Sequence, residues 1–246
     1  MLVTALMFVA LVFTGCPTNT DPEPDPWEKI ADWSEEGDFE LGTATADIDG
    51  TNGRYKETPL GNLIADGIAE YARYTSGEQV DFALHNGQDL KVNGLSAGKL
   101  TNTDISATIG NDTLYLVTYT GGEIKTLINI FVSSTSSGTW KANCVVLVSK
   151  EVSYSVTPNN DGPPSATSIK VNNKELDPAK TYWVAVGNFI GAATAEQNRF
   201  PVGTDKTDLG PTKLSEAVAQ YIYVQGTISP PEVNRISGTV PELSTN

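Results

Sequence analysis

The chain has 246 residues, of which 39% are apolar, and a formal net charge of -14. This length and apolar content are enough for one large domain with a real hydrophobic core, and they argue against disorder over most of the chain. The negative charge excludes an electrostatic nucleic-acid binder, because such a protein neutralises phosphates with clustered Lys and Arg. We therefore expect an acidic globular protein whose partners do not include nucleic acid.

The first fifteen residues, MLVTALMFVALVFTG, form an apolar segment without any charge. The segment is too short to be a comfortable permanent membrane span, and a short apolar stretch that ends in a small residue is typical of a secretory signal. The letters FTGC resemble the lipobox of bacterial lipoproteins, which implies cleavage before Cys16 and acylation of its thiol. A plain cleaved signal with an incidental cysteine is the alternative.

The sequence thus predicts an extracytoplasmic protein, at the cell surface or in the periplasm, that is held on the lipid bilayer through Cys16. The Pro- and Asp-rich residues 16–38 have no apolar periodicity, and we expect them to be a tether. We expect one domain over residues 39–240, followed by a tail over 241–246.

Several elements can be placed along that domain. Thr58 and Pro59 predict a helix start, because a hydroxyl can cap the first turn and proline suits the first helical position. A strand is expected over residues 80–86, ending at an Asn-Gly turn, and another over 113–119. The next helix starts with a capping box formed by Thr120 and Glu123. Hairpins follow, with a turn at Asn172, and a last helix is expected over 214–226.

Helices and strands are interspersed without a regular βαβ repeat, which favours an α+β fold with mixed β-sheets and packed helices. Five blocks occur along it in a fixed order: GRYKETPLGNLIADGI, VDFALHNG, TLYLVTYTGGEIKTLI, VNNKELDPAKTYWVAVGNFI and AVAQYIYVQGTISPPEVNRI. Together they resemble the C-terminal domain of the 5'-nucleotidases, from about residue 40 to residue 237.

In that family the C-terminal domain binds the nucleotide, and a separate N-terminal metallophosphatase domain with two metal ions carries out hydrolysis. A two-metal site takes several His, Asp and Asn ligands, whereas this chain has one histidine, His85, inside a binding block. We therefore expect the metallophosphatase half to be absent, and with it any catalytic residue, metal or cofactor.

The resemblance implies four substrate-binding residues. Arg54 matches an arginine that contacts substrate phosphate, a role that suits the planar guanidinium. Asn86 and Lys91 fall in the family's Asn-Gly-Gly-Gly-Ile-Arg turn, here NGQDLK, and Phe189 matches one of two rings that sandwich the base. The alternatives are a surface role for Arg54, paired with Glu57, and a core role for Phe189.

The sequence also departs from the family pattern at several positions. Gln88 and Asp89 replace two glycines of the turn, which adds bulk and a charge that repels phosphate. The second ring of the family is missing from TIGNDT, where Gly110 or a neighbour stands in its place, and Tyr115 or Trp183 are candidate substitutes. The Gly-Gly-Asp-Gly turn is replaced by GAATAEQNRF at residues 191–200.

Two further residues have plain interpretations. We expect His85 to orient the Asn-Gly turn rather than to act as a metal ligand or general base, since no second histidine exists. Cys144 lies in an apolar run, and we expect it to be a buried small hydrophobe rather than a nucleophile.

The leading hypothesis is a tethered binding domain, without catalysis of its own, for a nucleoside, nucleotide or related molecule. A second hypothesis makes it the substrate-binding subunit of a split hydrolase that works with a separate metallophosphatase. A third is a structural or interaction module with a degenerate pocket. A fourth assigns acid–base work to a pair among Asp66, Asp81 and Asp89, although Asp66 belongs to the helix motif and is expected to cap or pair locally.

Overall fold

The computed structural model describes Asp25, Trp27 and residues 38–133, 143–159, 161–194 and 200–241. The elements run in this order: β1 (Glu40–Ala44), β2 (Ile48–Asp49), α1 (Pro59–Ser76), β3 (Phe82–Asn86), the 3₁₀ turn η2 (Gly87–Asp89), β4 (Gly94–Leu95), β5 (Gly98–Thr101), α2 (Asn102–Ser106), β6 (Thr113–Thr120), α3 (Gly121–Val132), β7 (Val146–Val148), β8 (Val152–Thr157), β9 (Ser165–Val171), β10 (Lys174–Glu175), β11 (Thr181–Gly187), α4 (Asn188–Gly191), β12 (Lys206–Lys213), α5 (Leu214–Gln225), β13 (Thr227–Ile228) and β14 (Ile236–Ser237).

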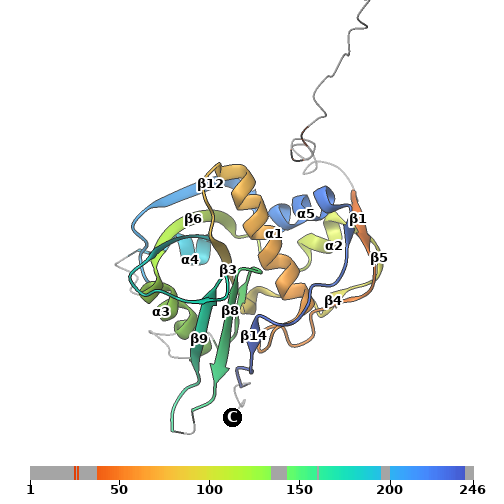
Figure 1. Cartoon of the computed structure of the whole chain (residues 1–246). Helices are drawn as coiled ribbons and strands as arrows, with labels where there is room; N and C mark the ends of the chain where they lie inside the picture. Colours follow the sequence, from red (N-terminus) through yellow and green to blue (C-terminus); the bar gives the residue numbers. More distant parts are fainter. Residues whose placement is uncertain are drawn as a thin grey trace, which may run out of the picture.

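The centre of the molecule is a five-stranded sheet in the order β12-β6-β11-β3-β7. β3 and β11 are parallel, and the other neighbours in this sheet are antiparallel. A four-stranded sheet, β10-β9-β8-β14, and two smaller sheets complete the fold. Figure 1 shows α3 next to β9, with α1 and α5 packed side by side on the other side of the molecule. These mixed sheets with packed helices confirm the predicted α+β class.

The alternation of side chains along β3 and β11 explains why both faces of the central sheet are covered. Phe82, Leu84 and Val184 belong to a buried cluster that includes α3, β8 and β9. The residues between them, Ala83 and Ala185, belong to a second cluster that includes α1 and α5. Because successive side chains of a strand point to opposite faces, the sheet separates two apolar cores, and small alanines face the helices.

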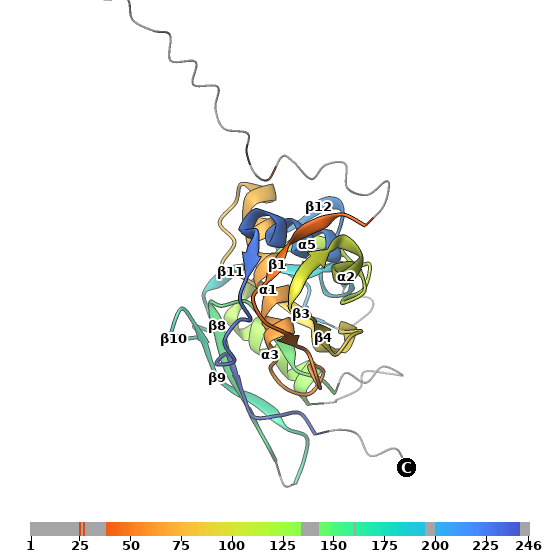
Figure 2. The same cartoon turned by 90° about the vertical axis from the view of Figure 1, so that its right-hand side faces the viewer.

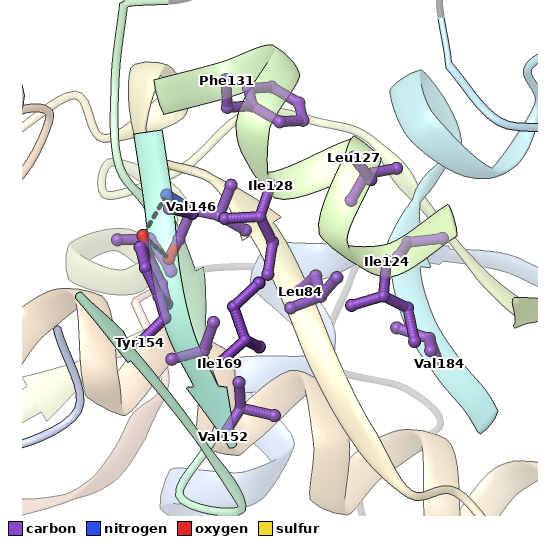
Figure 3. Close-up of a cluster of buried hydrophobic side chains, with 14 of the residues drawn as sticks. Leu84, Ile124, Leu127, Ile128, Phe131, Val146, Val152, Tyr154, Ile169 and Val184 are labelled. Atoms are coloured by element: carbon purple, nitrogen blue, oxygen red, sulfur yellow. Dashed lines mark hydrogen bonds between the residues drawn. The ribbon is translucent and has the colours of Figure 1, made fainter. Parts of the chain in front are cut away.

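The first cluster is drawn in Figure 3, where Ile124, Leu127 and Ile128 of α3 point toward the strands. Tyr154 of β8 is buried in the same cluster, and its hydroxyl accepts a hydrogen bond from Val146 N at 2.8 Å and donates one to Val146 O at 2.9 Å. Its polar end is therefore satisfied by the edge of the central sheet, as a buried hydroxyl requires.

The predicted helix starts are confirmed. Thr58 Oγ1 accepts a hydrogen bond from Gly61 N at 3.2 Å, and Gly77 caps the carboxyl end of α1 with a φ of 64°, which favours glycine. At α3, Glu123 N donates to Thr120 Oγ1 at 3.3 Å while Thr120 N donates to Glu123 Oε2 at 2.7 Å, which is the capping box expected from the sequence. Asn172 forms the predicted hairpin turn between β9 and β10, with a φ of 50°.

A buried ion pair ties the end of the domain to α1. Arg235 donates to both carboxylate oxygens of Asp66, at 2.8 and 2.7 Å, and to Val148 O at 2.9 Å. Asp66 also accepts from Lys150 N at 2.8 Å. The expectation that Asp66 pairs locally is therefore wrong, because its partners come from distant segments of the chain. Glu57 is buried as well and accepts backbone hydrogen bonds from Arg235 N and Ile236 N at 2.9 and 2.7 Å.

Part of the predicted tether contacts the domain. The ring of Trp27 stacks on Tyr74 of α1, with ring centroids 4.9 Å apart and an interplanar angle of 16°. Tyr74 donates to Asp25 Oδ2 at 3.1 Å, and Gln220 of α5 donates to the backbone carbonyl of Trp27. Residues 1–24, which include the predicted signal and Cys16, lie outside the described residues. Within the described ranges, no helix combines the length and the hydropathy needed to span a membrane.

Figure 2, turned by 90°, shows the β8–β9 hairpin extending beyond the body of the domain, away from α5 and β1. The candidate site lies at the central sheet rather than on this extension.

Candidate functional site

Strand topology brings three chain segments to one edge of the central sheet. β3 and β11 are parallel neighbours, with Leu84 opposite Val186, so their carboxyl ends, with His85 and Gly187, reach the same edge. β6 is antiparallel to β11 and pairs Leu114 with Gly187, so that the residue before β6, Asp112, reaches that edge too. The carboxyl ends of parallel strands are a common place for ligand sites.

A cavity of about 230 Å³ lies at this edge. It is lined by side chains and backbone from the ends of β3 and β11, from the turn before β6 and from α4: His85, Asn86, Asp89, Asp112, Gly187, Phe189 and Ile190. The cavity therefore contains two carboxylates, an imidazole, an amide and an aromatic ring, and no lysine or arginine is among its described lining residues.

Asn86 shapes the turn that closes one side of the cavity. Its Oδ1 accepts hydrogen bonds from Gln88 N at 2.9 Å and from the thiol of Cys144 at 3.3 Å. The first of these caps η2. Gly87 is required in this turn because a Cβ atom there would lie 2.5 Å from Val145 O. Asn86 thus lines the cavity, with its side-chain oxygen already engaged in two local hydrogen bonds.

Cys144 is buried, as the sequence predicts, and burial raises the pKa of its thiol to about 12. The backbone of Gln88 and the charge of Arg54 oppose this shift without reversing it. Because a thiolate is the reactive form of cysteine, this thiol acts as a hydrogen-bond donor to Asn86 rather than as a nucleophile.

Asp89 and Gly110 are in direct contact. Asp89 Oδ2 accepts a hydrogen bond from Gly110 N at 2.8 Å. A Cβ atom at position 110 would lie 2.6 Å from Asp89 Oδ1, so the carboxylate occupies the space that any side chain at 110 would need. Burial opposes the charge of Asp89, but the nearby His85 and the Gly110 amide outweigh it and lower the pKa of this carboxyl.

His85 is the most buried polar side chain of the cavity, with 2% of its surface exposed. Its Nε2 lies 3.3 Å from Asp89 Oδ2, within ion-pair distance, but has no hydrogen-bond partner among the described residues. The contact is therefore electrostatic, since a distance alone does not make a hydrogen bond.

Asp112 approaches α4 closely. Its Oδ2 accepts a hydrogen bond from Phe189 N at 3.2 Å, and a Cβ atom at position 187 would lie 3.0 Å from the same oxygen. Gly187 is thus the residue that allows a carboxylate to reach the start of α4. Asp112 and Gly187 were not singled out by sequence reasoning; the signal that identifies Asp112 is an acidic residue placed directly before a buried strand.

The structure places the four predicted binding residues in two groups. Asn86 and Phe189 line the cavity. Arg54 and Lys91 are not among its lining residues: Arg54 donates from Nε to Asn143 O at 3.4 Å with its guanidinium over the ring of Tyr55, and Lys91 is exposed. Of the alternatives, the pairing of Arg54 with Glu57 is not what the structure shows, since Glu57 accepts from backbone amides near the chain end.

Aromatic rings near the cavity differ from the expected pair. Phe189 contacts Phe200 edge to face, with centroids 5.4 Å apart, and Phe200 stacks on Phe131 of α3. Trp183 packs against the cluster on the α1 side, and Tyr115 has Lys206 near its ring at 5.8 Å. Neither ring lines the cavity. Phe189 itself is half-buried: it packs against the first hydrophobic cluster and also lines the cavity.

The remaining acidic residues of the fourth hypothesis do not meet. Asp81 accepts from Trp183 N at 2.8 Å at the opposite end of β3, and Asp66 pairs with Arg235. Across the described residues, no group of three or more His, Cys, Asp or Glu side chains is arranged to hold a metal ion.

A family model described as "5'-nucleotidase, C-terminal domain" matches residues 40–201. The trifunctional nucleotide phosphoesterase protein YfkN of Bacillus subtilis is 27% identical over 197 residues, which are 77% of this chain and 13% of that protein. Endonuclease YhcR of the same organism is 26% identical over 186 residues, which are 74% of this chain and 14% of that protein. The chain thus matches a small part of each of these relatives.

Solved structures share the fold. The 5'-nucleotidase precursor from Thermus thermophilus superimposes with a TM-score of 0.66 at 21% identity, over 81% of this chain and 39% of that chain. The NAD nucleotidase of Haemophilus influenzae gives a TM-score of 0.60 at 16% identity, over 80% of this chain and 37% of that chain. At these identities the likeness concerns the fold alone.

Proposed function

Because this chain belongs to the family of 5'-nucleotidase C-terminal domains, we propose that it is an extracytoplasmic binding domain, held on the membrane through Cys16, for a nucleoside, nucleotide or related molecule. It catalyses no reaction alone. The observation that carries the proposal is the cavity at the carboxyl ends of β3 and β11, which combines the half-buried ring of Phe189 with polar side chains from two other segments. An apolar surface with a few converging polar groups is typical of a small-molecule site.

The non-catalytic role is supported by the small number of histidines, because metal-dependent hydrolysis needs several side chains that bind metal ions. A two-metal site clamps both the attacking and the leaving oxygens of a phosphoryl group and takes several His, Asp and Asn ligands. The 246 residues contain one histidine, His85, which lies in the cavity next to Asp89 and not in a metal cluster.

The place where Trp27 docks supports a tethered arrangement. Tyr71 and Tyr74, which contact the ring of Trp27, lie near the carboxyl end of α1, and that end leads into the amino end of β3. The cavity lies at the carboxyl end of β3. A chain that runs from the membrane to Trp27 would therefore hold the domain by one end of the sheet and leave the other end open to ligand.

Isothermal titration of the full chain in detergent tests the binding role. The panel contains nucleosides, nucleotides and UDP-sugars at millimolar concentration. We expect heat of binding from at least one member, with loss of that signal in Phe189→Ala. Absence of heat across the whole panel contradicts the proposal and favours a structural or interaction module.

A second candidate function is the substrate-binding subunit of a split hydrolase. It is favoured by the short span of the match, because the chain corresponds to 13% of a phosphoesterase that also contains other segments. Affinity purification of the chain from its native membranes tests this candidate. Recovery of a metallophosphatase that gains turnover when the chain is added supports it, and recovery of none rejects it.

A further inference from the structure

The charge of the cavity is opposite to what a phosphate site needs. Asp89 and Asp112 both line it, and no lysine or arginine does so among the described residues. An ionised carboxylate offers about four acceptor positions on its two oxygens. Asp89 and Asp112 each accept one described backbone hydrogen bond, from Gly110 N and Phe189 N. Both carboxylates therefore retain acceptor capacity for further hydrogen-bond donors, N–H or O–H groups.

His85 is a second and independent indication of a ligand. It lines the same cavity with 2% of its side chain exposed, and its Nε2 lies beside Asp89 without forming a hydrogen bond in the described structure. Buried polar atoms are nearly always paired, so an unpaired one needs an explanation. A polar ligand group that reaches Asp89 Oδ2 would also lie beside this nitrogen, which can donate or accept a hydrogen bond according to where the imidazole carries its proton.

The size of the cavity limits what enters it. Its volume of about 230 Å³ is below the range of about 300–1,000 Å³ that is usual for pockets that bury a drug-sized ligand. A single planar ring system therefore fits better than a whole nucleotide. The half-buried ring of Phe189 provides an apolar surface for such a ring, and Asn86 lies on the same lining.

We propose that the cavity selects a planar ligand by an amino or amidinium group that donates hydrogen bonds to Asp89 and Asp112, and that phosphate stays outside it. This inference rests on the proposed binding function and makes the ligand a nucleoside or base with an exocyclic amino group. Asp89 is then one of the two residues that recognise the ligand. Its carboxylate has room beside position 110 because that residue is a glycine.

The test is isothermal titration of the full chain in detergent with four probes: adenosine, purine riboside, AMP and benzamidine. Purine riboside is adenosine without its amino group, so the pair measures that group alone. We expect adenosine to bind at least about tenfold more tightly than purine riboside, because losing the donor leaves buried acceptors unpaired. AMP should bind no more tightly than adenosine. A difference under about threefold between the two ribosides, or tighter binding of AMP, overturns the inference.

Variants identify the groups responsible. Asp89→Asn and Asp112→Asn keep an oxygen for the backbone amides but remove the charge, and each should weaken adenosine binding by about tenfold or more. Asp47→Asn is the matched control, since this exposed carboxylate also accepts a backbone hydrogen bond, from Ala97 N at 2.8 Å, away from the cavity lining. Unchanged binding in both cavity variants, with folding verified by circular dichroism, contradicts the inference.

Benzamidine separates this inference from the proposed function. It carries a planar ring and an amidinium group but is no nucleoside. Binding of benzamidine, lost in Asp89→Asn, without binding of any nucleoside supports the amino-group selection and contradicts the nucleoside function. Binding of nucleotides without regard to the amino group supports the function and contradicts the selection. Binding of no probe contradicts both.

Discussion

The carboxylate of Asp89 fills the space beside Gly110, where a Cβ atom would lie 2.6 Å from Oδ1 and 2.7 Å from Oδ2. Asp89 and Gly110 are also joined by a hydrogen bond of 2.8 Å. Asp89 stands where the family pattern is expected to have a glycine, and Gly110 lies in the TIGNDT segment where an aromatic ring of that pattern is expected at 110 or a neighbouring position. A side chain at position 110 and the carboxylate of Asp89 therefore compete for one space.

The contact predicts coupling between the two positions. Gly110→Ala should lower the free energy of unfolding by about 1 to 3 kcal/mol, because the new methyl group must displace the carboxylate or the backbone. In an Asp89→Gly background the same substitution should be much less costly. Urea denaturation of the two single variants and the double variant measures the coupling, and strictly additive effects would show that the contact is unimportant.

The buried pair of Asp66 and Arg235 should be far more sensitive than a neighbouring exposed pair. Asp66→Asn leaves the guanidinium of Arg235 buried without a counter-charge, and we expect a loss of about 3 to 5 kcal/mol in the free energy of unfolding. The control is Lys150→Met, which removes a 2.7 Å ion pair with Glu70 whose lysine side chain is 59% exposed. That change should cost about 1 kcal/mol or less, and equal losses would contradict this ranking.

The lowered pKa of Asp89 predicts a pH-dependent contribution to stability. A carboxyl whose pKa is lower in the folded state stabilises the protein above its unfolded pKa, here near the ordinary 3.8, and loses that contribution as the pH falls through the folded value. The difference in unfolding free energy between wild type and Asp89→Asn should therefore shrink as the pH is lowered from about 5. A difference that is constant or grows toward acid pH would show that the ionised form of Asp89 is not stabilised.

Docking of Trp27 predicts a local effect on the segment before the domain. Trp27→Ala removes the stack on Tyr74, an interaction of about 0.5 to 1.5 kcal/mol beyond burial. Limited proteolysis should then cut this segment faster, while the melting temperature of the domain changes little. Tyr74→Ala should give the same pattern, and the double variant should add nothing. Unchanged cutting rates would contradict a stable contact.

The proposed acylation of Cys16 predicts where the chain is found in cells. Cys16→Ser should move the protein from the membrane fraction to the soluble fraction, because the substitution removes the thiol that would carry the lipid anchor. Cys144→Ser is the matched control and should leave the protein with the membranes. Membrane association that survives in Cys16→Ser would contradict the lipoprotein hypothesis.

Local structure could be predicted wherever a few adjacent residues decide it. The cap formed by Thr58, the box of Thr120 and Glu123 and the turn at Asn172 each need only neighbouring groups, and all three are confirmed. A second capping box, of Thr101 and Asp104 at the start of α2, follows the same rule but was overlooked, because that helix is only 5 residues long and has little apolar periodicity.

Long-range relationships were beyond the sequence. Nothing local indicates that β3 pairs with β11 in parallel, yet this pairing puts His85 and Phe189 on one cavity. The partner of Asp66 is 169 residues away. Asp112 was missed for the same reason, because its importance depends on where β6 starts relative to β11. Likewise, the resemblance grouped four residues, Arg54, Asn86, Lys91 and Phe189. Of these four, Asn86 and Phe189 are among the lining residues of the described cavity.

The cavity between the ends of β3 and β11 is the proposed binding site. Hydrogen exchange of the full chain with and without adenosine tests it directly, because the amides of Gln88, Gly110 and Phe189 are held by the side chains of Asn86, Asp89 and Asp112. We predict that adenosine slows exchange at these three turns and leaves the β8–β9 hairpin unchanged. Unaltered exchange at all three turns with millimolar adenosine would contradict the claim.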